Sequence, residues 1–179
     1  AALSLGVESY HLRKPHWGAR KIRAYLNQFD SQERQRIAVH TKSELLFEIQ
    51  SLRVHLKSHQ VSLKQRFQSI RNSEVLSHSV HSLVEVKECY GYFDYLFMSP
   101  VFPSISKPGH TPMWSHAEFK SLVQDLKVSP QDKEPSLLRK FRPTQFVALG
   151  GVSHENISQV KDLGFEGVAI LGSFWRSTD

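Results

Sequence analysis

The chain has 179 residues, of which 40% are hydrophobic and 11% aromatic, a composition that supports one folded domain and excludes a disordered protein. Its formal net charge is +6, but the Lys and Arg residues are scattered along the chain, which favours a small phosphorylated ligand and argues against nucleic acid. No apolar run is long enough to cross a membrane, and the single cysteine excludes an internal disulfide, so we expect a cytoplasmic protein.

Strands are expected to alternate with helices from one end of the chain to the other. The apolar pattern predicts seven short strands, at Val7–Arg13, Ile37–His40, Arg53–Lys57, Val75–Ser79, Asp94–Met98, Gln145–Leu149 and Gly167–Leu171. Helical spacing predicts helices at Ala19–Phe29, Thr41–Gln50, Ser62–Ile70, Ser82–Tyr90, Ser115–Leu126 and Ser153–Leu163, with Ser43 and Ser153 as N-caps. The polar segment Val128–Pro143 is expected to be the most mobile part of the surface.

This alternation predicts an α/β fold with an all-parallel sheet. An open doubly wound sheet and a closed barrel both fit the pattern. The shortness of the strands and the polar residues at their C-terminal ends favour a (β/α)8 TIM barrel, because barrel enzymes place their sites there. A barrel has eight strands. We therefore expect residues 1–179 to be a single TIM-barrel domain that lacks its first strand.

Small residues after the last two predicted strands are candidates for binding a phosphate. Gly150 and Gly151 have no side chain to keep a ligand away from their backbone N–H groups. Leu171, Gly172 and Ser173 offer a second set of N–H groups, where a helical turn would begin. A plain turn explains either pair of small residues alone, whereas the two together favour a phosphate site.

The loop after the fifth predicted strand carries a third candidate. Ser104 and Ser106 place two hydroxyl groups at alternate positions, and Lys107 follows them. These groups can donate several hydrogen bonds to one phosphate or pyrophosphate. The alternative is an ordinary Ser-rich surface loop.

Five histidines are predicted at or just past strand ends: His11, His40, His55, His78 and His81. Each could be a hydrogen-bonded structural histidine. His81, which follows Ser79 and begins a helix, could act as a general acid or base near neutral pH. His11, His40 and His55 could bind a transition metal together, but no carboxylate accompanies them, so we expect no metal site.

Two cations follow the first predicted strand. Arg13 and Lys14 could bind a second anionic group, or they could lie in a solvated loop end. With His11, His40 and Ser79 they make up the predicted second anion or substrate site.

Four motifs together resemble the thiamine phosphate synthase and TenI (thiazole tautomerase) superfamily. They are YHLRKP at Tyr10–Pro15, SVHSLVEV at Ser79–Val86, DYLFMSPVFPSISKPG at Asp94–Gly109, and VALGGV with GFEGVAILGS near the end of the chain. The resemblance implies a (β/α)8 barrel that acts on a phosphorylated thiazole. It implies that Ser104, Ser106 and Lys107 hold phosphates, that Gly151 and Leu171–Ser173 cradle the thiazole phosphate, and that Arg13 binds a pyrophosphate.

The chain departs from the synthase pattern where that pattern binds Mg²⁺. His11 stands in place of a Gln and Pro15 in place of a Lys, while His40-Thr41 stands in place of Asn-Asp. A second acidic pair is replaced within Ser58, His59 and Gln60. Because Mg²⁺ prefers carboxylate and other hard oxygen ligands, the coupling reaction of a synthase should suffer.

The resemblance therefore favours a TenI-like thiazole tautomerase, whose motif has a His at the position of His81 as general acid/base. This reaction needs no cofactor. One alternative is a divergent thiamine phosphate synthase that uses His40 or His59 in place of the carboxylates, with Mg²⁺. Another is a non-catalytic protein that binds thiazole phosphate or thiamine phosphate. The sequence leaves the oligomeric state open, a homo-oligomer included.

Overall fold

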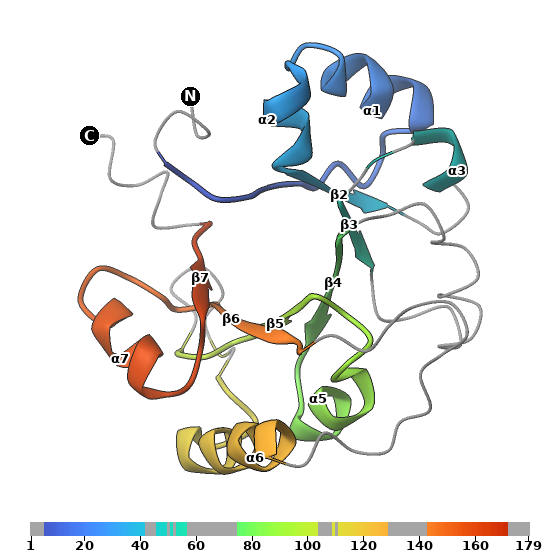
Figure 1. Cartoon of the computed structure of the whole chain (residues 1–179). Coiled ribbons are helices and arrows are strands. Elements are labelled where there is room, and N and C mark those ends of the chain that lie inside the picture. Colours follow the sequence, from blue (N-terminus) through green and yellow to red (C-terminus); the bar gives the residue numbers. More distant parts are fainter. Residues whose placement is uncertain are drawn as a thin grey trace. The chain divides into compact units, whose positions relative to one another are not determined.

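The computed structural model describes residues 6–41, 46–49, 51, 53–56, 75–103, 109, 111–128 and 143–171 of the chain (Figure 1). The chain divides into two compact units, Ala1–His78 and Ser79–Asp179. These are unit 1 and unit 2. Within the described residues, none of the helices is both long and apolar enough to span a membrane.

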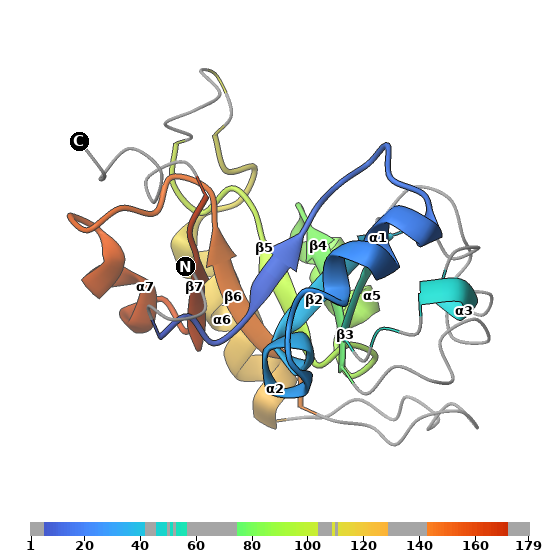
Figure 2. The same ribbon diagram turned by 90° about the horizontal axis from the view of Figure 1, so that it is seen from above.

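Unit 1 contains parallel strands that follow one another in sequence order. Its elements are β1 (Tyr10–Leu12), α1 (Ala19–Leu26), α2 (Ser31–Gln35), β2 (Ile37–Thr41), α3 (Leu46–Ile49), β3 (Arg53–Leu56) and the first four residues of β4 (Val75–Val80). Strand β1 pairs with β2, β2 with β3, and β3 with β4, all in parallel. Both views place α1 and α2 beside β2 (Figures 1 and 2).

Alternation along the strands builds the core of unit 1. Leu12, Ile37 and Val39 pack against Ile22 and Leu26 of α1, and all five are buried. Successive side chains of a strand point to opposite faces, so these apolar residues lie on the face of the sheet that the helices cover. The residues between them in sequence lie on the other face, and they form the first part of the candidate site.

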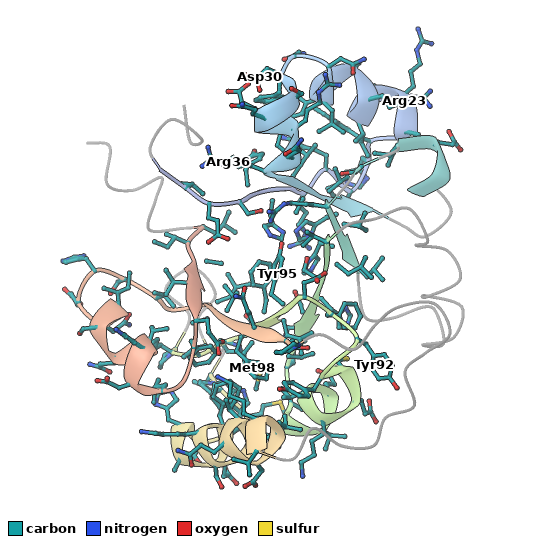
Figure 3. The ribbon with its side chains drawn as sticks, viewed as in Figure 1. Arg23, Asp30, Arg36, Tyr92, Tyr95 and Met98 are labelled. Atoms are coloured by element: carbon teal, nitrogen blue, oxygen red, sulfur yellow. The ribbon has the colours of Figure 1, made fainter. Side chains whose placement is uncertain are left out.

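Helix α2 is a five-residue element that the apolar pattern does not predict, because none of its residues is buried. Its N-terminus instead forms a capping box. The Asp30 carboxylate accepts a hydrogen bond from the Glu33 N–H (2.8 Å), and the Glu33 carboxylate accepts one from the Asp30 N–H (3.2 Å). Asp30 and Arg36 mark the two ends of this helix in Figure 3.

Unit 2 repeats the same βα pattern. Its elements are the end of β4, α5 (Leu83–Cys89), β5 (Tyr95–Met98), α6 (His116–Val128), β6 (Gln145–Leu149), α7 (Ile157–Asp162) and β7 (Gly167–Ala169). Strand β5 pairs with β6, and β6 with β7, again in parallel. Met98, labelled in Figure 3, is fully buried.

Aromatic side chains dominate the core of unit 2. The Phe119 ring of α6 stacks on Phe165 at 4.5 Å between centroids and meets Phe146 of β6 edge-on at 5.4 Å. Tyr90 stacks on the same Phe146 ring at 6.0 Å. These contacts join α6 to β6 and to the chain just before β7.

The predicted α/β class with parallel strands is confirmed, and so is the TIM-type strand order. In a doubly wound sheet the strand order reverses at a switch point, whereas a barrel sheet proceeds in one direction. Within unit 1 the order is β1-β2-β3-β4, and within unit 2 it is β5-β6-β7, with no reversal in either.

Several predicted boundaries are corrected by a few residues. Strand β1 begins at Tyr10 and β7 ends at Ala169, so both are shorter than predicted. The prediction that Ser153 caps the last helix is wrong, because α7 begins at Ile157 with Asn156 as its N-cap residue. The Asn156 side chain accepts a hydrogen bond from the Ser153 N–H (2.9 Å) and so closes a turn ahead of the helix. The predicted helix Ser62–Ile70, the Ser43 cap and residues 129–142 of the polar segment lie outside the described residues.

Candidate functional site

Three histidines of unit 1 come from three successive strands and lie on one face of the sheet. In the strand register His40 of β2 pairs with His55 of β3, and His11 of β1 pairs with Ala38, two residues before His40. Paired residues share a face of the sheet, so all three imidazoles lie opposite the helix-covered face. Ala38 is small, which leaves room for the His11 ring to reach diagonally toward His40.

The three rings are in direct contact. His11 Nδ1 and His40 Nε2 are 2.9 Å apart and share a hydrogen bond. The rings of His40 and His55 stack at 4.0 Å between centroids, and the His11 ring meets each of them edge-on. The potential ligand atoms of the three residues all lie within 4.8 Å of one another. We call these residues the histidine cluster.

Ser77 of β4 fixes the orientation of His55. Both residues are buried, and His55 Nδ1 lies 2.9 Å from Ser77 Oγ. The Ser77 hydroxyl donates to the Val54 carbonyl oxygen (3.3 Å), so it accepts from the His55 Nδ1–H. The lone pair of neutral His55 is then on Nε2. Sequence analysis did not single out Ser77, although its place two residues before Ser79 on the same face of the strand was a usable signal.

The surroundings keep two members of the cluster neutral. Burial, with the Arg53 guanidinium as a smaller cause, lowers the pKa of His11 to about 4. Burial lowers the pKa of His55 well below its usual range, and the nearby His40, His11, His78 and Arg13 lower it further. Neutral imidazole is the form that binds metals and accepts hydrogen bonds.

His78 does not belong to the cluster, although the sequence grouped it with the other histidines. It pairs with Leu56, which lies on the opposite face of the sheet from His55. Its Nδ1–H donates to the Leu56 carbonyl oxygen (2.7 Å), and its side chain is buried. This arrangement is that of a structural histidine.

The two predicted cations after β1 are exposed. The Lys14 ammonium lies over the Trp17 ring, 5.4 Å from its centroid. A cation–π contact of this kind, at an exposed site, is worth about 0.5–1 kcal/mol and leaves the ammonium accessible to solvent. Arg13 lies close enough to the cluster to act on the pKa of His55.

His81 lies in unit 2, directly after β4, and is exposed. Its Nδ1–H donates to the carbonyl oxygen of Ser99 (2.7 Å), the residue that follows β5. Its backbone N–H donates to the Glu85 carboxylate (2.6 Å), and Ser82 caps the following helix α5. The Ser99 carbonyl therefore selects the tautomer of neutral His81 that has its lone pair on Nε2. Sequence analysis missed this role of Ser99, because a carbonyl acceptor leaves no signal in the sequence.

The Gly150-Gly151 turn after β6 packs against the chain that follows β5. The Val101 and Phe102 N–H groups donate to the carbonyl oxygens of Leu149 and Gly150, both at 3.1 Å. Gly151 has a φ of +69°, and a Cβ there would lie 2.5 Å from the Pro103 carbonyl oxygen. Close approach of two backbone segments thus accounts for this glycine. Whether its N–H also meets a phosphate stays a prediction.

The other predicted phosphate-binding residues are only partly within the described residues. Leu171 is exposed, two residues after the end of β7. Ser79 of the predicted second anion or substrate site is half-buried and is the last residue but one of β4. Ser104, Ser106, Lys107, Gly172 and Ser173 lie outside the described residues, as do Ser58, His59 and Gln60.

The donor set that the described residues of unit 1 bring together does not fit Mg²⁺. Mg²⁺ requires oxygen ligands, usually with one or two carboxylates. The side chains that come together at the ends of β1, β2 and β3 are imidazoles, and among the described residues they are the ones that group in this way.

Comparisons with known proteins agree on one family. A family model described as thiamine monophosphate synthase matches residues 1–174. The chain is similar to a thiamine-phosphate synthase of Listeria welshimeri, with 28% identity over 75% of this chain and 59% of the relative. It is also similar to one of Syntrophomonas wolfei, with 21% identity over 99% of this chain and 79% of the relative.

Two solved structures have a similar fold. A thiamine phosphate pyrophosphorylase of Bacteroides thetaiotaomicron superposes with a TM-score of 0.64 and 26% identity, covering 99% of this chain and 76% of that one. A thiamine phosphate pyrophosphorylase of Pyrococcus furiosus has a TM-score of 0.65 and 18% identity over 94% of this chain and 75% of that one, and at this identity the likeness concerns the fold alone. The alignment with Listeria welshimeri spans about three-fifths of that relative's length.

Proposed function

The chain belongs to the thiamine monophosphate synthase family, and from that premise we propose that it acts on a thiazole phosphate by proton transfer at His81. The observation that carries the proposal is the hydrogen bond from His81 Nδ1–H to the Ser99 carbonyl oxygen. It orients the ring and leaves Nε2 as the basic nitrogen, which is the arrangement that a general base needs.

In the proposed reaction the chain shifts a proton within one substrate. His81 Nε2 accepts a proton from the non-aromatic thiazole phosphate, and the imidazolium returns a proton to another position of the same molecule. The product is the aromatic isomer, so atoms and electrons balance without a further reactant. The phosphate is expected to bind at Gly150, Gly151 and Leu171, together with Ser104, Ser106, Lys107, Gly172 and Ser173.

The proposal is tested by assaying the purified chain with both isomers of thiazole carboxylate phosphate. We expect His81→Ala to lower the isomerisation rate by about 10²–10⁴-fold, the usual contribution of general acid–base catalysis. Binding of the phosphorylated product should change little. His154→Ala is the matched control, because His154 is also an exposed histidine of unit 2. An unchanged rate in His81→Ala would refute the assignment.

A second candidate is a thiamine-phosphate synthase, which is favoured by the names of the relatives from Listeria welshimeri and Syntrophomonas wolfei. It is tested by supplying the thiazole phosphate and the aminopyrimidine pyrophosphate, with and without Mg²⁺. Release of pyrophosphate would select this reaction. Tight binding of thiazole phosphate without turnover in either assay would instead select a non-catalytic binding protein.

A further inference from the structure

The histidine cluster of unit 1 is not used by the proposed proton transfer. His11, His40 and His55 come from three parallel strands, and their possible ligand atoms lie within 4.8 Å of one another. A tetrahedral zinc ion with Zn–N bonds of about 2.0–2.1 Å holds its ligand nitrogens about 3.3 Å apart. His11 Nδ1 and His40 Nε2 are 2.9 Å apart, so an ion would require this pair to open and the stacked rings of His40 and His55 to tilt until their in-plane lone pairs converge.

The hydrogen bonds around the cluster prepare the ligand nitrogens. Ser77 accepts the Nδ1–H of His55, which places the lone pair of the neutral ring on Nε2. Hydrogen bonding of the second ring nitrogen is the usual way in which proteins orient a metal-binding histidine. In the pair His11 and His40 one nitrogen donates to the other. An ion would replace that shared proton, which moves to the remaining nitrogen of the same ring, so both imidazoles stay neutral.

The ligand type restricts the ion. Three imidazoles without a carboxylate suit Zn²⁺, Co²⁺, Ni²⁺ or Cu²⁺ and not Mg²⁺ or Ca²⁺. Three protein ligands also leave a fourth position open, as in catalytic zinc sites.

The neighbouring charges indicate what the fourth ligand would be. Arg53 of β3 pairs with Ala38 and so lies on the same face of the sheet as the cluster, and Arg13 directly follows β1. These two guanidinium groups would repel a bare dication. They favour an ion whose fourth ligand is an anion, such as a phosphate or carboxylate oxygen.

We propose that His11, His40 and His55 form a three-histidine site for a zinc-class divalent transition metal, with a fourth position for an anionic ligand. The proposal does not rest on the proposed function. Failure of the isomerase assay would leave it intact, and failure to bind metal would leave the His81 assignment intact.

Metal titration of the full chain, first stripped with a chelator, tests the site. Zn²⁺ should bind with one equivalent in competition with a chromophoric chelator. Co²⁺ should produce the visible absorption bands of a tetrahedral complex. Inorganic phosphate should shift those bands if an anion takes the fourth position, and unchanged bands would overturn that part of the proposal.

Variants assign the binding to the cluster. His40→Ala and His11→Gln should each weaken Zn²⁺ binding at least tenfold, with circular dichroism confirming the fold. His16→Ala is the control, since His16 is an exposed histidine of the same unit. If His40→Ala does not fold, His11→Gln and the Co²⁺ spectrum of the unaltered chain still test whether the histidine cluster binds the metal. Absent Co²⁺ bands, or an equal loss of affinity in His16→Ala, would overturn the proposal and leave a hydrogen-bonded histidine network.

Discussion

The two units of this chain are built from the same βα pattern but end their strands in different ways. In unit 1, the strand ends place side chains together, the imidazoles of His11, His40 and His55. In unit 2, the ends of β5 and β6 meet through their backbones, with Val101 and Phe102 N–H groups donating to Leu149 and Gly150 carbonyl oxygens. Side chains therefore contact one another where the strands of unit 1 end, whereas in unit 2 the backbone after β5 contacts the backbone after β6.

This difference decides which substitutions each unit tolerates. A side-chain cluster can be changed one residue at a time, and the cost is mainly a lost hydrogen bond or a changed pKa. Two backbone segments in contact leave no room for a Cβ, so a single methyl group forces the main chain to move. We expect the largest stability effects in unit 2 and the largest pH effects in unit 1.

The sharpest test of the backbone contact is Gly151→Ala. A Cβ at this position would lie 2.5–2.7 Å from backbone atoms of Phe102 and Pro103, and the φ of +69° already disfavours a side chain. We expect a loss of about 3–5 kcal/mol in the free energy of unfolding, at the upper end for single substitutions. Urea denaturation of the variant measures it.

Gly164→Ala is the matched control for the same measurement. Gly164 also has a positive φ, +95°, but a Cβ there meets only a Val123 methyl group at 3.9 Å. Its cost should be about 1–2 kcal/mol, that of the left-handed backbone conformation alone. Equal losses in the two variants would mean that the contact with Phe102 and Pro103 contributes nothing.

The second prediction concerns how the free energy of unfolding depends on pH through His11 of unit 1. The pKa of His11 is about 4 in the fold, against 6.5 for the free side chain, so the unfolded chain binds more protons between these values. Stability contributed by neutral His11 is complete above pH 6.5 and is lost as the pH falls toward 4. The loss is up to about 3 kcal/mol, at 1.36 kcal/mol for each pH unit between the two pKa values.

Urea denaturation at pH 7, 5.5 and 4, with chelator present, checks this dependence. His11→Gln removes the titrating group and keeps a hydrogen-bonding side chain, so its stability should change less with pH than that of the unaltered chain. His16→Ala, an exposed histidine of the same unit, should retain the full dependence. Identical pH profiles for His11→Gln and the unaltered chain would contradict the role given to His11.

The same contrast explains what could be predicted from the sequence. The strands follow from apolar patterns, and the α/β class was predictable because strands such as β2 begin with a short buried apolar run, here Ile37–Val39. His11, His40 and His55 were identified at strand ends. Their meeting depends on the register that sets His40 beside His55, and this register depends on loop geometry that the sequence pattern does not encode.

Backbone features were harder to predict. The Gly150-Gly151 pair was predicted as an approach for a ligand, yet the nearest group to Gly151 is the backbone of Phe102 and Pro103. Nothing in the sequence says which segment will approach a glycine. Helix α2 was missed because it buries no side chain, although the Asp30…Glu33 spacing of its capping box was visible.

The third prediction compares one buried hydroxyl in each unit. Ser77 bonds His55 and the Val54 carbonyl in unit 1, while Thr144 bonds the Gly91 N–H and the Phe93 carbonyl in unit 2, both at 2.8 Å. Ser77→Ala and Thr144→Val should each cost about 1–3 kcal/mol, because buried partners lose their hydrogen bonds. Only Ser77→Ala should also weaken Zn²⁺ binding. Equal effects of both variants on metal affinity would show that Ser77 does not orient His55 for metal binding.

The smallest effect is expected for the ion pair between Lys127 and Glu166 on the surface of unit 2. The two groups are 2.5 Å apart, but the Lys127 side chain is 47% exposed, and exposed pairs contribute only about 0–1 kcal/mol. Lys127→Met should therefore change the urea midpoint little. Glu166→Ala should cost more, because its carboxylate also accepts the Phe146 N–H at the start of β6 (2.7 Å). If Lys127→Met lowered the stability more than Glu166→Ala, the ion pair would contribute more to stability than the hydrogen bond from the Phe146 N–H to the Glu166 carboxylate.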